Sequence, residues 1–93
     1  MSTPEEKLET VRKRLAWRAS RRGIKEMDIV VGGFADARLP TMTPQELVVF
    51  EVLLEIPDQQ LLSWVTGQED VPLELRSPML MDMLAFRPLQ VTE

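Results

Sequence analysis

Apolar residues recur along most of the chain at the three- and four-residue spacing of an α-helix. Leu8, Val11 and Leu15 form a narrow apolar stripe, and residues 3–6 in front of it supply an N-cap, a first-turn proline and a capping-box glutamate. We expect this first helix to end at Gly23, because a left-handed C-cap costs glycine no steric penalty. The pattern therefore predicts a helix that packs a single apolar stripe against the core.

The segment from Ile24 to Leu39 allows two structures. Its β-branched run from Ile29 to Val31, followed by Gly32-Gly33, is typical of a strand and a hairpin turn. A helix would instead place Met27, Phe34 and one of the valines between them on one side, with each glycine costing about 1 kcal/mol relative to alanine. Periodicity leaves both structures open. In a helix, the paired glycines would indicate close backbone packing against a neighbour or a local break.

The middle of the chain predicts two consecutive helices. Thr43, Pro44 and Glu46 repeat the cap, proline and capping-box order. The wide apolar face that follows is made of Leu47, Val48, Phe50, Leu53 and Leu54. Pro57-Asp58 ends this helix and starts the next one, which Gly67 closes. The apolar residues of the second helix are Leu61, Leu62, Trp64 and Val65.

The last part of the chain reads as a loop, Gln68 to Pro72, followed by one short helix that Ser77-Pro78 opens and Pro88 stops. The apolar residues of this helix are Met79, Leu80, Met83, Leu84 and Phe86. Residues 1–4 and 89–93 are expected to be loose termini. The whole pattern predicts one domain over residues 1–93, an all-α bundle of five short helices.

Composition excludes most catalytic chemistry. The chain has 93 residues, enough for one modest core, and 44% of them are apolar and 28% charged, as in ordinary soluble globular proteins. It contains no histidine, cysteine or tyrosine. Thiol nucleophiles, thiolate metal sites, disulfides and a standard neutral-pH general base are therefore excluded. Carboxylates at Glu51, Glu55 and Asp58 lack the loop glycine of a calcium site, so we interpret them as a solvated helix face.

Neither a membrane nor an export signal is indicated. The longest uncharged apolar run, Ile29 to Ala35, is far shorter than the roughly 20 residues of a membrane-spanning helix. The first residues, MSTPEEKLET, resemble neither a secretory signal nor a transit peptide. We therefore expect no membrane insertion and a protein that stays in the compartment where it is made.

Charge is unevenly distributed along the chain, although the net charge is only −4. Residues 12–25 contain bases and no acid, namely Arg12, Lys13, Arg14, Arg18, Arg21, Arg22 and Lys25. Residues 39–75 contain acids and no base, namely Glu46, Glu51, Glu55, Asp58, Glu69, Asp70 and Glu74. Either the two segments pair across the fold, or the basic one binds a partner.

Two features of the basic segment could form a binding surface. Trp17 lies off the first apolar stripe beside Arg18, where it is either an exposed contact residue or packed under a neighbouring helix. Arg22, Gly23 and Glu26 form an R-G-x-x-E sequence at a helix junction. It either presents its charges on a short turn, or is merely a glycine cap in which the arginine pairs with the glutamate.

The junction sequence is part of a longer pattern that resembles a known family. The matching residues are Arg22-Gly23-x-x-Glu26, Met27-Asp28, Phe34, Leu47-x-x-Phe50-Glu51-x-Leu53-Leu54, Asp58, Trp64 and Gly67. They resemble the SdhE type of FAD assembly factor, the flavinylation factors of succinate dehydrogenase, called succinate dehydrogenase assembly factor 2 in mitochondria. The resemblance covers about Leu8 to Gly67, and it favours the helix over the hairpin after Ile24.

The resemblance implies an assembly factor and not an enzyme. It implies that the chain binds the flavoprotein subunit of succinate dehydrogenase, and in bacteria that of fumarate reductase, and promotes covalent attachment of FAD to a histidine of that partner. Cofactors of its own are not implied, and we expect a cytoplasmic bacterial protein that is monomeric when free. The predicted partner-binding residues are Trp17, Arg18, Arg21, Arg22, Gly23, Glu26 and Asp28. The alternative is a regulatory protein that is antitoxin-like or binds nucleic acid through the basic helix. The net negative charge of the chain counts against this alternative.

Overall fold

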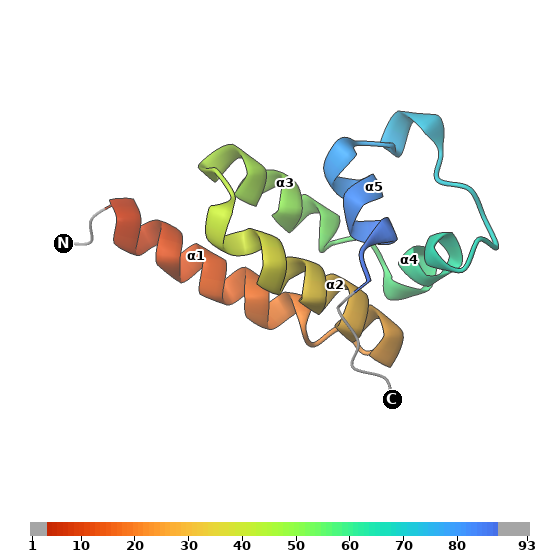
Figure 1. The fold of residues 1–93 in the computed structure, drawn as a ribbon, viewed down its shortest axis with the longest axis horizontal. Helices are drawn as coiled ribbons and strands as arrows, with labels where there is room; N and C mark the ends of the chain where they lie inside the picture. Colours follow the sequence, from red (N-terminus) through yellow and green to blue (C-terminus); the bar gives the residue numbers. More distant parts are fainter. Residues whose placement is uncertain (1–3, 88–93) are drawn as a thin grey trace.

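The computed structural model describes residues 4–87, and within that range the chain forms five α-helices, two short 3-10 helices and no strand. Figure 1 shows the elements in chain order: α1 (Pro4–Ala19), α2 (Lys25–Arg38), η1 (Leu39–Thr41), α3 (Pro44–Leu53), α4 (Asp58–Val65), η2 (Leu73–Leu75) and α5 (Pro78–Ala85). The predicted all-α fold of five helices is confirmed. Of the expected loose termini, residues 1–3 and 89–93 lie outside the described residues, as does Pro88, whereas Pro4 begins α1.

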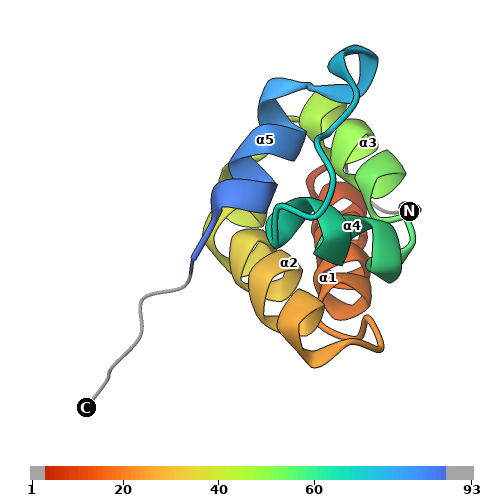
Figure 2. The ribbon, with the colours of Figure 1, turned by 90° about the vertical axis from the view of Figure 1, so that its right-hand side faces the viewer.

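Helices α1 and α2 lie side by side, and α3 and α5 pack on them (Figures 1 and 2). Helix α2 runs without interruption through Gly32-Gly33, so the hairpin alternative is wrong. A Cβ at Gly32 would lie 3.3 Å from Cα of Ser20, at the end of α1. Gly32 therefore permits close backbone packing between the two helices, as one of the two readings of the paired glycines predicts.

The end of the first helix differs from the prediction. Helix α1 ends at Ala19, before Gly23, which instead lies in the loop that leads to α2. The N–H of Ser20 donates to the carbonyl oxygens of Ala16 and Trp17 at 3.2 and 3.3 Å, which closes the last turn of α1. The glycine is needed for the path of the loop and not as the cap of α1.

The predicted starts of α3, α4 and α5 and the end of α4 are confirmed, whereas α3 ends at Leu53, before Pro57, and α5 ends at Ala85, before Phe86. Thr43 and Glu46 form a complete capping box at the start of α3, and the Ser77 hydroxyl accepts from the Leu80 N–H at 3.2 Å at the start of α5. Gly67 has φ +81° just beyond α4, as a left-handed helix end requires. The 3-10 helix η1 was not predicted; the side chain of Arg12 donates to its Leu39 carbonyl at 3.0 Å.

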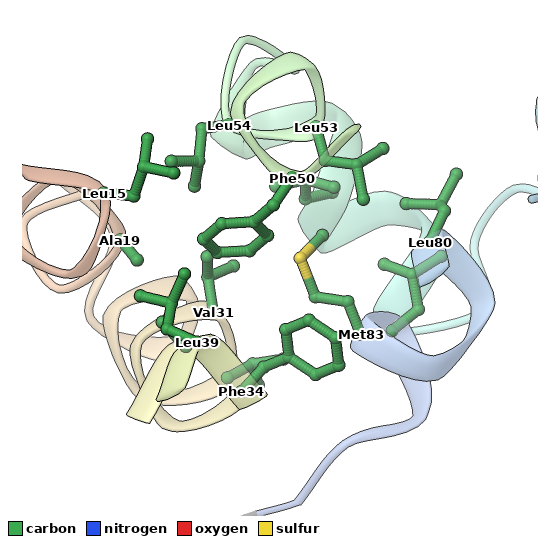
Figure 3. Packing of buried hydrophobic residues seen from close by; sticks show 14 of the residues in the cluster. Leu15, Ala19, Val31, Phe34, Leu39, Phe50, Leu53, Leu54, Leu80 and Met83 are labelled. Atoms are coloured by element: carbon green, nitrogen blue, oxygen red, sulfur yellow. The ribbon is translucent and has the colours of Figure 1, made fainter. Parts of the chain in front are cut away.

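The core fills the space between α2, α3 and α5. The ring of Phe34 lies with its centroid 5.9 Å from those of Phe50 and Phe86, and Met83 and Leu80 close the core on the α5 side (Figure 3). Trp64, one of the predicted apolar residues of α4, is only half-buried at the core's edge. Val48, which belongs to the predicted wide apolar face of α3, is exposed because α3 is covered on one side only. In the part of the chain described, no helix has both the length and the apolar character needed to cross a membrane.

Candidate functional site

The predicted site residues cluster where the loop between α1 and α2 meets the turn between α3 and α4. We call residues 17–28 the α1–α2 corner. Figure 2 shows its loop below α4. The corner contains the end of α1, the loop of residues 20–24 and the first turn of α2. Because short connections join helices here, a few side chains decide how the corner is held.

Arg22 fixes the corner to the α3–α4 turn. Its guanidinium donates through Nε to Oδ1 of Asp58 at 2.6 Å, through Nη1 to the Leu54 carbonyl at 2.7 Å and through Nη2 to the Ile56 carbonyl at 2.6 Å. Only 9% of the side chain is exposed. A planar guanidinium suits this arrangement because it directs several donors at once, and the carbonyls after a helix lack intrahelical partners. Arg22 therefore joins the end of α3, the start of α4 and the corner.

The backbone of the loop is held as tightly as the side chain. Oδ1 of Asp28 accepts a hydrogen bond from the Arg22 N–H, so the acid that follows the motif closes the loop onto α2. Gly23 has φ +111°, which side-chain-bearing residues rarely adopt. The expected alternative in which Arg22 pairs with Glu26 is wrong, because Arg22 pairs with Asp58.

Several side chains of the corner are exposed, among them Trp17, Arg21 and Glu26. Trp17 is 60% exposed, so its exposed reading is confirmed, and the Arg21 guanidinium carbon lies 4.6 Å from the ring centroid. Glu26, in the first turn of α2, is exposed and makes no side-chain hydrogen bond or ion pair with a described residue. The exposed residues of the corner thus include a cation stacked on an aromatic ring and, in the first turn of α2, an anion.

The basic and acidic segments pair across the fold. Arg14 and Arg18 of α1 contact Glu51 of α3 at 3.0 and 3.6 Å, and Arg18 also contacts Glu55 at 2.6 Å. Together with the Asp58 pair, these contacts occupy the carboxylates of the predicted solvated face. Pairing was one of the two interpretations of the charge pattern. It neutralises much of the basic helix and leaves less charge free for a partner than the sequence suggests.

A shallow cleft of about 350 Å³ separates the corner from the α3–α4 turn. Trp17, Arg18, Arg21 and Arg22 line one side, and residues 54–58 line the other. Gly23 lies at its edge, since a Cβ there would be 3.6 Å from Oδ2 of Asp58. The cleft does not include Glu26 or Asp28 in its lining.

Sequence reasoning missed Asp58 and Glu55 as members of the site. Asp58 belongs to the quoted resemblance, and both residues belong to the acidic segment opposite the bases. The opposite charges of the two segments were therefore the signal that could have found them. Among the described residues, no group of three or more acidic, histidine or cysteine side chains could hold a metal ion.

The fold and the corner together define a class of protein: a small helical protein with a fixed, charged corner. Over residues 13–87 the chain matches the Sdh5 family, the flavinator of succinate dehydrogenase, and it belongs to that family. The family and its relatives are named as assembly factors and not as catalysts.

Its relatives include bacterial and mitochondrial proteins. The FAD assembly factor SdhE of Acetobacter pasteurianus is 44% identical over 80 residues, covering 86% of this chain and 73% of the relative. The protein of the same name from Vibrio parahaemolyticus is 40% identical over 67 residues, covering 72% and 71%. The mitochondrial succinate dehydrogenase assembly factor 2 of Dictyostelium discoideum is 30% identical over 73 residues. The match covers 78% of this chain but only 52% of the Dictyostelium protein. No solved structure matches the chain.

Proposed function

We propose that this chain binds the flavoprotein subunit of succinate dehydrogenase through the α1–α2 corner and promotes covalent attachment of FAD to it. The proposal rests on one observation: the two charged residues of the R-G-x-x-E sequence point in different directions. Arg22 is turned inward and holds the loop, whereas Glu26 is turned outward without a partner in the described structure. A charged group kept free on a rigid loop loses little conformational entropy when a partner pairs with it.

The partner contact is assigned to the exposed members of the predicted site. Trp17, Arg21, Gly23 and Glu26 would touch the flavoprotein, with the stacked tryptophan and arginine as its energetic centre. Arg18, Arg22 and Asp28 would act indirectly, because they hold the loop and helices in place. The corner would steady the partner around bound FAD and raise the population of the conformer in which the partner's histidine meets the flavin.

The chemistry of bond formation is assigned to the partner and its flavin. The sequence has no histidine, cysteine or tyrosine to which FAD could itself be joined. The proposal therefore gives this chain no cofactor of its own and treats FAD as cargo of the complex. Fumarate reductase, whose flavoprotein the resemblance also implies, is the proposed second partner, and the bacterial cytoplasm is the proposed location.

The nucleic-acid alternative is weakened by the pairing of the basic helix. Arg12 donates to two backbone carbonyls, Arg14 and Arg18 pair with glutamates, and Arg22 pairs with Asp58. Phosphate binding would need free cations along one face. A gel-shift at moderate salt decides between the two functions: a shift with steep salt dependence would favour nucleic acid over the proposed partner.

Co-expression with a succinate dehydrogenase flavoprotein subunit tests the proposal. We expect in-gel flavin fluorescence of that subunit to rise when this chain is present and to fall to the background level with Glu26→Ala. The matched control is Asp36→Ala, which removes an exposed carboxylate of the same helix away from the corner. Equal flavinylation with the folded Glu26→Ala variant and with the native chain would contradict the proposal.

A further inference from the structure

The outer face of α3 is unusually apolar for a surface. This helix, PQELVVFEVL, buries Leu47, Phe50 and Leu53 against the core. Its opposite side is apolar as well: Val48 is 65% exposed and Val52 is 62% exposed. Apolar residues on a helix normally face the core, so exposed valines on the side away from the core are unusual. The described part of the chain supplies no cover for this face.

An apolar groove of about 360 Å³ adjoins the outer face of α3. It runs between α3, α4 and η2, and its floor includes the buried residues Leu53 and Leu80. Its remaining apolar lining consists of Val52, Ile56, Trp64, Pro72 and Leu75. Large contiguous apolar patches are rare on the surface of monomeric proteins, and they often mark interaction sites. We call the groove together with Val48 and Val52 the α3 groove.

The α3 groove is continuous with the α1–α2 corner. Ile56 lines both the cleft of the corner and the groove, and its carbonyl oxygen accepts from Arg22. Only the Ile56 side chain therefore lies between the corner and the groove, so a partner bound at the corner could also contact the groove. Because Arg22 fixes the turn that contains Ile56, the two surfaces also hold a fixed position relative to each other.

Charge at the η2 end of the groove indicates the chemistry of its occupant. Glu74 lies in η2 between the lining residues Pro72 and Leu75, and it makes no ion pair with a described residue. Glu69 and Asp70 line a neighbouring pocket and not the groove. The next base along the chain, Arg76, donates through Nε to the Val71 carbonyl at 2.8 Å. A segment with basic side chains beside its apolar face would complement this end.

We propose that the α3 groove takes an amphipathic helix of the same flavoprotein subunit that contacts the corner, with its apolar face on Val48 and Val52 and basic residues toward Glu74. The inference rests on the proposed function and extends its interface. A second copy of this chain fits less well, because a two-fold axis would bring the same unpaired carboxylate to both sides of the interface. A helix laid in an apolar groove is a recurrent mode of recognition.

Binding of variants to the purified flavoprotein subunit tests the inference. We expect Val52→Lys and Val48→Lys each to raise the Kd about tenfold or more, since each places a charge in the apolar contact. The matched control is Ala37→Lys on α2, an exposed apolar residue outside both surfaces, which should bind like the native chain. Glu74→Lys should weaken binding more at low salt than at high salt. Circular dichroism checks that every variant is folded.

The two proposals fail in different ways. If the native chain binds and Glu26→Ala weakens binding, but both lysine variants of α3 bind as the native chain does, the groove proposal is overturned and the proposed function stands. Absence of any binding by the native chain would overturn both. Sedimentation velocity completes the test: a native dimer that Val52→Lys converts to monomer would assign the face to a second copy and overturn the groove proposal.

Discussion

Two connections of this protein contain a glycine with positive φ, and they are held in opposite ways. The loop of residues 20–24 is bound by Arg22 to residues more than thirty positions away along the chain. The connection between α4 and α5 is held by near neighbours, such as Arg76 to Val71, and a Cβ at Gly67 would meet nothing within 4 Å. Long-range bonds make the first connection part of the tertiary structure, whereas the second follows a mostly local path.

This difference gives each connection a different role. A loop fixed from several directions loses little conformational entropy on binding, which would suit the docking proposed above. The second connection instead exposes apolar side chains, with Leu73 78% exposed. Substitutions at equivalent positions in the two connections should therefore have unequal effects.

The largest expected difference is between the two arginines. We expect Arg22→Ala to lower the free energy of unfolding by about 2–4 kcal/mol, because it leaves Asp58 and two backbone carbonyls without their charged donor. Arg76→Ala should cost less than about 1 kcal/mol, since it removes one bond of an exposed residue. Urea denaturation of both variants measures the difference. Equal losses would show that Arg22 does not hold the corner.

The second comparison is between the two glycines. We expect Gly23→Ala and Gly67→Ala each to cost about 1–3 kcal/mol, because both force a side-chain-bearing residue to positive φ. Only Gly23→Ala should also weaken binding to the flavoprotein subunit, because only this glycine lies in the corner. Thermal melts and a binding titration separate the two effects. A Gly67→Ala variant that lost binding to the same extent would remove the distinction between the connections.

The smallest effect is expected for the exposed ion pairs of α1. Arg14→Ala should change the free energy of unfolding by about 0–1 kcal/mol, because half of its side chain is exposed and water screens its pair with Glu51. The difference from Arg22→Ala in the same denaturation experiment measures how much burial matters at this side of the protein. A loss as large as that of Arg22→Ala would mean that the ion pairs act as one network.

The sequence predicted correctly those features that depend on residues close together in the chain, and it failed where the contacts join distant segments. The starts of α3 and α5 were predicted because Thr43 and Ser77 bond to backbone groups three residues away. The end of α1 was wrong, because Gly23 is placed by the path to α2 and by contact with the α3–α4 turn. Val48 belongs to the predicted apolar face of α3 but is exposed, since helical spacing alone does not tell which part of a wide apolar face meets the core.

The candidate site shows the same limit. The position of R-G-x-x-E at a helix junction was readable from the chain, and the resemblance drew attention to it. That Arg22 turns inward to Asp58 while Glu26 turns outward was not readable, because both are charged residues next to a glycine. Opposite charge in two segments predicted pairing without telling which arginine meets which carboxylate.

By itself the sequence determined five helices, most of their starts and the absence of the side chains that most catalytic centres use. Those properties depend on composition and on contacts within a few residues. Only the tertiary structure decided which charges are fixed and which are free, and that one face of α3 stays uncovered. Each of these depends on how close segments distant in the sequence come, and helical periodicity carries no information about that distance.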